Sequence, residues 1–198
     1  RLAGAMRAAR LKESPEDQRL AAIRGLATNI CGPLLVAFTL FVLRKAREAG
    51  IQRLYFLSRR GELPLKIARL FQEEFPEIEL RYLHSSRWAW RPAAHGRWCR
   101  ELWDDLMDNR FPMSVQEVLR VLGLAQEEFA GDFIRRFEHD PDSEAMFSWL
   151  SRPEVAGLID RNLQAKRALV LDYLQAKGVR EKRRIGMVDD GWSGKGQR

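Results

Sequence analysis

The sequence is poor in the residues that form metal sites and disulfide frameworks. It has two cysteines, Cys31 and Cys99, and three histidines among 198 residues. Their spacing matches no zinc pattern, and two cysteines are too few for the framework of a disulfide-rich secreted domain. Neither cysteine has a neighbouring base that the sequence identifies. These absences exclude motif-based zinc enzymes and cysteine-rich secreted domains, and we expect a cytoplasmic protein.

Loop motifs of two large enzyme classes and long apolar runs are also absent. No Gly-x-Ser-x-Gly turn exists, and the glycines before Lys195 lack the spacing of a Walker A loop. The longest apolar stretch, residues 33–43, has about half of the roughly 20 residues that a transmembrane helix requires. The N-terminal residues show no signal-peptide pattern. We therefore expect no membrane span.

What remains is an ordinary globular composition with an excess of basic residues. Hydrophobic residues make up 45% and charged residues 31% of the chain, which is typical of a folded domain. The net charge of +7 favours anionic partners, from phosphorylated metabolites to nucleic acid. The chain opens on an arginine and ends in a glycine-rich loop, so we interpret it as a piece of a longer protein.

Residues 53–63 form the most specific local pattern. The apolar run Leu54–Leu57 predicts a buried strand, and an amphipathic helix begins near Leu63. In open α/β sheets, ligands bind at the carboxyl ends of strands, where the intervening turn would lie. A hydroxyl, two arginines and the N–H groups of a helix start suit an anion such as phosphate. The predicted ligand-binding residues of this turn are Ser58, Arg59, Arg60 and Gly61. The alternative is that the arginines are solvated and the glycine only makes the turn.

A second apolar run, near the C-terminus, ends in two carboxylates. Ile185–Val188 predicts a strand, and Asp189 and Asp190 follow it directly. Paired carboxylates at a strand end are poorly placed for packing, but they can hold a metal ion or sugar hydroxyls. We predict Asp189 and Asp190 as catalytic residues and as ligands of Mg²⁺. The predicted ligand-binding residues of the following loop are Gly191, Ser193, Gly194 and Lys195.

Arginine is interleaved with aromatic residues in the segment from Leu80 to Arg100. It contains no acidic residue, but five arginines, three tryptophans and two histidines. Such a composition suits pairing with phosphate and stacking of a base or sugar ring. We predict Arg87 as a ligand-binding residue. The alternative is a core-lining segment whose tryptophans pack under the sheet while its arginines reach solvent.

The rest of the chain predicts one more strand and many helices. Residues 78–84 alternate apolar and polar side chains, which favours a strand parallel to the first. A second N-terminal helix is expected from Pro33, after a break at Gly32. Ser114 and Glu117 form a capping box, and a long helix is expected over roughly 154–177. We predict N-terminal helices over 1–50, an α/β core over 51–100 and 179–198, and a helical insertion over 101–178.

These motifs carry a resemblance to a known family. The segments 54–61, 82–87 and 188–194, together with 32–34 and Gln197, resemble the C-terminal region of predicted haloacid-dehalogenase-like (HAD) hydrolases. Those are large bacterial proteins, often associated with surface-glycan glycosyltransferases. The resemblance implies a hydrolase acting on phosphate esters, with an upstream catalytic domain that carries the Asp-x-Asp nucleophile motif. Arg60 stands where the family usually has an acid, and Asp190 where it usually has an apolar residue.

A second resemblance is to type I phosphoribosyltransferases. Arg60-Gly61 looks like the first loop of that family, and Asp189-Asp190 with Ser193-Gly194 looks like its ribose and phosphate sites. It implies that the two acids hold the ribose hydroxyls and that the following loop holds the 5-phosphate. The chain departs from the family in the single glycine after Arg60 and in the long helical insertion.

We therefore predict an α/β fold, a Rossmann-like parallel sheet with a large helical insertion, in a domain that continues beyond residue 198. The predicted function is the handling of phosphate or nucleotide-sugar ligands within a HAD-like hydrolase of surface-glycan metabolism, without catalysis by this piece alone. A phosphoribosyltransferase-like domain is the alternative. The expected partner is a small phosphorylated or nucleotide-linked anion and not nucleic acid, with Mg²⁺ as the cofactor.

Overall fold

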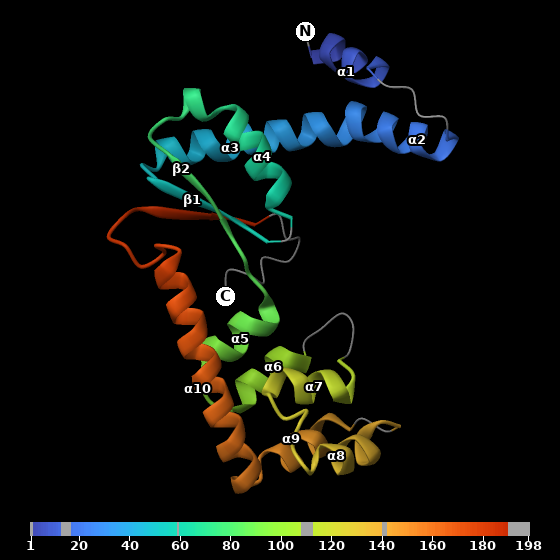
Figure 1. Ribbon diagram of the computed structural model, residues 1–198, viewed down its shortest axis with the longest axis vertical. Coiled ribbons are helices and arrows are strands. Elements are labelled where there is room, and N and C mark those ends of the chain that lie inside the picture. Colours follow the sequence, from blue (N-terminus) through green and yellow to red (C-terminus); the bar gives the residue numbers. More distant parts are fainter. Residues whose placement is uncertain (1, 13–16, 59, 108–112, 140–141, 190–198) are drawn as a thin grey trace. The chain divides into compact units, whose positions relative to one another are not determined.

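The computed structural model describes residues 2–12, 17–58, 60–107, 113–139 and 142–189. The chain divides into two compact units (Figure 1). The first consists of Arg1–His84 and Lys182–Arg198 and contains the sheet, whereas the second is Ser85–Glu181 and contains only helices among its described elements. Helices combined with a small parallel sheet make this an α/β chain, which confirms the predicted fold class at that level.

Among the residues that the structure describes, three short strands form the sheet of the first unit. They are β1 (Arg53–Leu57), β2 (Glu79–Leu83) and β3 (Ile185–Val188). The order is β2-β1-β3, and both pairings are parallel, as predicted for the first two strands. All five residues of β1 are buried, which fits the apolar and aromatic composition of a central strand in a parallel sheet. β1 is therefore the strand around which this unit is built.

One face of the sheet is covered by α3 (Gly32–Glu48) and α4 (Glu62–Leu70) (Figure 1). Side chains alternate along a strand, so Leu54 and Phe56 of β1 point to these helices and the remaining side chains point to the other face. The helices contribute Leu43, Ala46, Leu65 and Ala68 to the same core. Burial of a side chain as large as that of Phe56 contributes about 1.5–3 kcal/mol, so this layer dominates the stability of the unit.

α2 (Gln18–Leu26) and α3 are joined by a π-helical turn into one continuous helix. α1 (Leu2–Leu11) precedes α2, the π-helical turn (Ala27–Cys31) follows α2, and α3 continues it, so that Gln18–Glu48 spans 31 residues. The predicted break at Gly32 and Pro33 is wrong. Pro33 has no N–H to donate to the preceding turn, and the wider π-turn accommodates the missing hydrogen bond without ending the helix.

Much of this long helix is exposed. Six large apolar side chains on it are 54–67% exposed, namely Leu20, Ile23, Leu26, Ile30, Leu34 and Phe41. By length and composition alone the helix could cross a membrane, and it is the only such helix in the described ranges. Core helices and signal sequences share these properties. We expected no membrane span because the apolar stretch 33–43 is too short. The continuous helix is long enough, so its length no longer argues against a span, but length and composition do not establish one.

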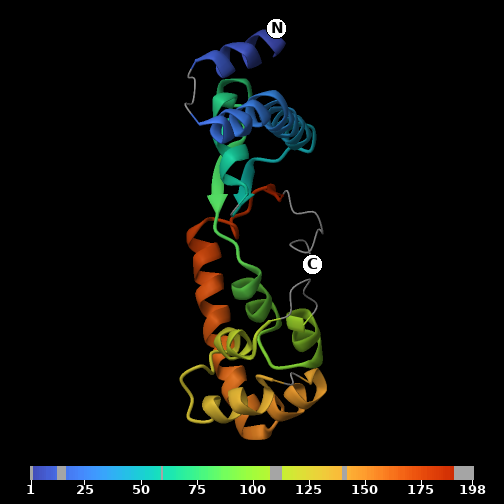
Figure 2. The same cartoon turned by 90° about the vertical axis from the view of Figure 1, so that its right-hand side faces the viewer.

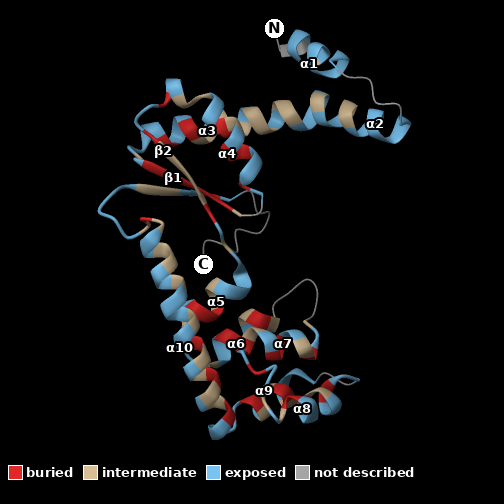
Figure 3. Cartoon of the chain, in the orientation of Figure 1, coloured by how far each residue is buried: buried red, intermediate tan, exposed pale blue. Residues whose placement is uncertain are grey.

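Within its described residues, the second unit is built of six helices. Figure 3 shows them coloured by burial. They are α5 (Arg87–His95), α6 (Arg100–Met107), α7 (Val115–Leu122), α8 (Ala130–Phe137), α9 (Ser143–Leu150) and α10 (Pro153–Ala176). The predicted capping box of Ser114 and Glu117 and the predicted long helix, now α10, are both confirmed. Trp103 is fully buried at the centre, and its indole N–H donates to the Ser143 hydroxyl over 3.1 Å, so no polar atom of this ring is left without a partner.

α5 belongs to this helical unit, although the sequence division grouped residues up to 100 with the α/β core. α5 (green) lies beside α10 (orange) in both views (Figure 2). The guanidinium of Arg167 on α10 donates to the carbonyls of Ala93 and Ala94 at the end of α5, over 2.7 and 2.8 Å. These bonds satisfy carbonyls that a helix end otherwise leaves unpaired.

The segment from Leu80 to Arg100 has a ligand-binding and a core-lining interpretation, and the contacts of Trp98 fit the core-lining interpretation at that position. It is half-buried and packs against the core of the helical unit, 5.5 Å from the stacked ring of Phe147 and 6.0 Å from Trp103. Its indole N–H donates to the Ser151 hydroxyl over 2.9 Å. Trp98 is therefore a packing residue.

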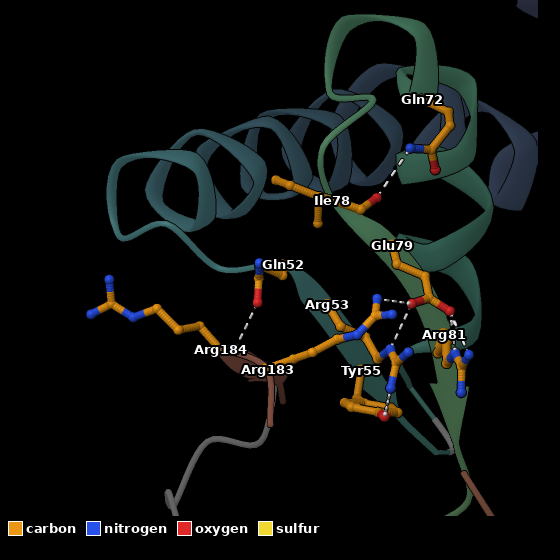
Figure 4. A network of polar contacts seen from close by, with 9 residues as sticks. All are labelled: Gln52, Arg53, Tyr55, Gln72, Ile78, Glu79, Arg81, Arg183 and Arg184. Atoms are coloured by element: carbon orange, nitrogen blue, oxygen red, sulfur yellow. Dashed lines mark hydrogen bonds and ion pairs between the residues drawn. The ribbon is translucent and has the colours of Figure 1, made fainter. Parts of the chain in front are cut away.

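A polar cluster occupies the amino end of the sheet, on the face away from α3 and α4 (Figure 4). Arg53, 2% exposed, donates through Nε to a carboxylate oxygen of Glu79 over 2.7 Å and lies 3.3 Å from the Tyr55 hydroxyl. Arg81 Nε donates to Glu79 Oε1 over 2.5 Å. A guanidinium nitrogen of Arg183 lies 3.4 Å from Glu79 Oε2, the oxygen that Arg53 binds. Partial burial raises the pKa of Glu79, but the bonds from Arg53 and Arg81 outweigh it and hold that pKa below its usual value.

Substitution Glu79→Gln should lower the free energy of unfolding by about 1–3 kcal/mol at pH 7, because it leaves the buried Arg53 guanidinium without its counter-ion. Since the pKa of Glu79 is lowered on folding, the stabilisation is present above pH 4.5 and is lost as the pH falls below it. Urea unfolding at pH 7 and pH 3 measures both effects.

The matched control is Glu77→Gln, which removes an exposed ion pair with Arg47 and should change stability little. Equal losses for the two variants, or a Glu79→Gln loss that persists at pH 3, would contradict the role given to Glu79.

Candidate functional site

Parallel pairing brings the carboxyl ends of all three strands to one edge of the sheet. Leu57 of β1 pairs with Leu83 of β2, and Phe56 pairs with Val188 of β3. The chain therefore leaves β1 at Ser58 and β3 at Asp189 from adjacent strands. The Ser58 N–H donates to the Leu83 carbonyl over 2.9 Å, which ties the start of the turn to β2. Two of the predicted loops thus begin side by side.

Gly61 is required by close packing and not by an unusual backbone angle. Its φ is −65°, which any residue adopts, but a Cβ there would lie 2.4 Å from the Leu57 carbonyl oxygen and 2.8 Å from the Leu57 nitrogen. The Gly61 N–H donates to the same carbonyl over 2.8 Å. The turn between β1 and α4 is therefore folded tightly onto the end of β1, and only glycine fits at its last position.

The electrostatics of this turn are mixed. Arg60 is exposed and Ser58 is half-buried, while Arg59 lies outside the described residues. Glu62, in the first turn of α4, forms an ion pair with Lys66 at 2.8 Å, and the hydrogen bond from Lys66 lowers the pKa of Glu62. Because the Gly61 N–H is already bonded and Glu62 is anionic, the attraction for a bound anion falls mainly on Arg60 and the dipole of α4.

Of the predicted metal-binding pair, the structure describes only Asp189, which is exposed at the end of β3. Asp190 and the predicted loop residues Gly191, Ser193, Gly194 and Lys195 lie outside the described residues. Among the described side chains, no group of three or more histidines, cysteines or carboxylates is positioned to hold a metal ion. The Mg²⁺ site therefore stays a prediction.

Arg87, the remaining predicted ligand residue, belongs to the helical unit. It is the first residue of α5, and its guanidinium lies 5.4 Å from the centre of the Trp88 ring. Cation–π contact of this kind holds an exposed arginine side chain in one orientation and contributes about 0.5–1 kcal/mol. The structure thus pairs Arg87 with an exposed aromatic ring in the second unit.

A Cys–His–Asp arrangement that the sequence did not identify joins α5 to α6. Cys99 Sγ lies 3.7 Å from His95 Nδ1, and His95 Nε2 lies 3.0 Å from a carboxylate oxygen of Asp105. Burial raises the pKa of the Cys99 thiol, the Leu102 N–H lowers it, and the Glu101 carboxylate raises it further. The net rise keeps the thiol protonated at neutral pH, which does not suit a nucleophile. The spacing of His95 and Cys99 was the available sign of this arrangement in the sequence. Because Gly96 ends α5 between them, helical periodicity does not predict that the two side chains meet.

Substitution Gly61→Ala should lower the free energy of unfolding by about 1–3 kcal/mol, because the new methyl group forces the turn away from Leu57. Gly157 on α10 has open space around its Cα, so Gly157→Ala should raise stability by about 0.5–1 kcal/mol. Urea unfolding of both variants checks the difference in sign. A Gly61→Ala protein as stable as the parent would show that the turn is not tightly packed.

Iodoacetamide at pH 8 should alkylate the exposed Cys31 several-fold faster than Cys99, because the raised pKa of Cys99 keeps its reactive thiolate scarce. Peptide mass spectrometry of a time course measures both rates in one sample. A faster reaction at Cys99 that slows in His95→Gln would instead identify Cys99 as an activated nucleophile.

A scan against protein-family models gives no match for this chain, and a search of curated proteins gives none either. The likeness of the strand-end loops to HAD-like hydrolases therefore keeps the standing of a prediction.

Proposed function

We propose that the first unit is a Rossmann-like domain that binds a phosphorylated or nucleotide-linked small molecule at the carboxyl edge of its sheet. Strand order is the observation that carries this proposal. The order β2-β1-β3 matches the first three strands of the doubly wound order 2-1-3-4-5, in which the chain winds from β1 in one direction and then in the other. In such sheets the ligand crevice lies at the carboxyl ends of β1 and β3, where the direction of winding reverses.

The residues at that point suit an anion that carries hydroxyl groups. Arg60 and the amino end of α4 supply positive potential beside β1, and Asp189 supplies a carboxylate beside β3. Because Gly61 packs directly on Leu57, the turn holds Arg60 and the start of α4 close to the end of β1. A phosphate next to β1 and a ribose or sugar hydroxyl next to Asp189 would use both.

Within the resemblance drawn from the sequence, this domain would belong to a HAD-like hydrolase of surface-glycan metabolism. A hydrolase acting on phosphate esters needs positioned cations and carboxylates that hold Mg²⁺ more than it needs a strong nucleophile. Asp189 and Asp190 would hold the metal, and the nucleophilic Asp-x-Asp motif would come from an upstream domain. By itself the domain would bind its ligand without turning it over.

Calorimetric titration with UDP-glucose and Mg²⁺ should therefore detect binding to the chain without hydrolysis. Asp189→Asn and Arg60→Gln should each weaken binding about tenfold, which corresponds to the loss of one charge-assisted hydrogen bond. Arg69→Gln, which removes an exposed arginine at the far end of α4, is the matched control and should leave the affinity unchanged.

Titration with phosphoribosyl pyrophosphate and Mg²⁺ tests the alternative family in the same assay. Binding of that compound but not of UDP-glucose would favour the phosphoribosyltransferase-like domain. Absence of binding to either compound, or equal affinities for the parent, Asp189→Asn and Arg60→Gln proteins, would reject a ligand site at this edge. Tight binding to duplex DNA with a steep salt dependence would instead indicate a nucleic-acid partner.

A further inference from the structure

The helical unit contains a pocket of its own, with a volume of about 470 Å³. Three helices that pack together, α5, α7 and α10, form its walls, with Met113 at the approach to α7. Its lining includes Trp88 and Ala89 of α5, Glu117 and Arg120 of α7, and Lys166 and Leu169 of α10. Pockets for small ligands in proteins are about 300–1,000 Å³, so this one is large enough for an organic molecule.

Most of the pocket wall is apolar and open to solvent. Only three large apolar side chains of the helical unit are exposed among its described residues: Trp88, Leu169 and Leu171. Trp88 and Leu169, which are 37% and 70% exposed, both line the pocket. Most of the other large apolar side chains described in this unit are partly or wholly buried in its own core. The apolar surface that this unit leaves uncovered is therefore concentrated where a ligand could cover it.

The charged groups of the pocket are predominantly basic. Lys166 of α10 is half-buried among apolar neighbours, its ammonium donates to the Val121 carbonyl, and burial lowers its pKa. Arg120 is exposed on the same wall as Glu117. The Glu117 carboxylate accepts bonds from the Ser114 N–H and hydroxyl over 2.9 and 3.0 Å, and these bonds lower its pKa. The nearby charge of Arg120 lowers this pKa as well, so Glu117 and Arg120 partly offset each other, and Lys166 is the remaining cation among the lining residues.

We propose that this pocket binds a small organic anion, with an apolar ring or chain against Trp88 and Leu169 and one acidic group at Lys166. An acidic group near Lys166 would give the half-buried ammonium a counter-ion in place of a neutral carbonyl. Arg120 would add a second, weaker attraction at the rim. The site is confined to the helical unit, so it stands or fails independently of the ligand site at the sheet edge.

Two fluorescent probes with the same aromatic body test the proposal on the full chain. 1-Anilinonaphthalene-8-sulfonate carries one sulfonate, and N-phenyl-1-naphthylamine carries none. Lys166→Met should weaken binding of the sulfonate about tenfold and leave the neutral probe unchanged, because it removes the charge and keeps an apolar chain. Ala89→Trp should weaken both probes by filling the pocket. Arg120→Met should weaken the sulfonate less than Lys166→Met does.

The matched controls are Lys66→Met, at an exposed lysine of the sheet unit, and Leu34→Ser, on the exposed apolar helix. Neither variant should change the affinity of the sulfonate probe for the site at Lys166. Circular dichroism establishes that each variant is folded, and the exposed Arg120 serves as the charge test if Lys166→Met does not fold. Probe binding that is unchanged in Ala89→Trp would overturn the site. If Lys166→Met lost affinity equally for both probes, the proposal that the ligand is an anion would be overturned. The same outcome in Arg120→Met would overturn it where that variant replaces Lys166→Met.

Discussion

Hydrogen bonding along both edges of β1 is the constraint on which the sheet unit depends. A five-residue strand with every side chain buried has no stable place at a sheet edge, so it requires a partner on each side. β2 and β3 supply these partners in parallel, and this pairing brings Ser58 and Asp189 to neighbouring strand ends. The packing of α3 and α4 on one face and the ion-pair cluster around Glu79 on the other then fix the strand against rotation. The candidate ligand edge is a consequence of that arrangement.

The arginine excess of the sequence favours anionic partners, but several of the arginines form ion pairs within the protein. Arg53, Arg81 and Arg183 surround the single carboxylate of Glu79, and Arg100 binds Glu144 and Asp104 in the helical unit. These side chains are engaged within the protein, so the 34 lysines and arginines of the sequence overstate the number of cations that are offered to ligands. Few cations line the proposed sites: Arg60 is exposed, whereas Lys166 is half-buried beside apolar and backbone groups, where one charge has a larger effect.

Local features of the fold were predictable from the sequence, and features that depend on distant contacts were not. The apolar runs of β1 and β3, the capping box at Ser114 and the length of α10 each follow from neighbouring residues. The helix through Pro33 did not, because a π-turn rather than a break absorbs the missing N–H. The reason for Gly61 lies in its approach to Leu57, and the pocket at Lys166 needs α5, α7 and α10 together. No periodicity in a single segment encodes those contacts.

The separation of β3 from β1 along the chain also sets the order in which the protein can assemble. Arg53 and Glu79, at the start of β1 and β2, are 26 positions apart, whereas Gln52 and Arg184 are 132 positions apart. At a synthesis rate of about 5–20 residues per second, the roughly 100 residues between β2 and β3 take about 5–20 s to emerge from the ribosome. During that time the helical unit can form by itself, while one edge of β1 awaits its partner. If β1 and β2 pair before β3 emerges, the nascent chain has an open apolar strand edge, and such edges are prone to aggregation.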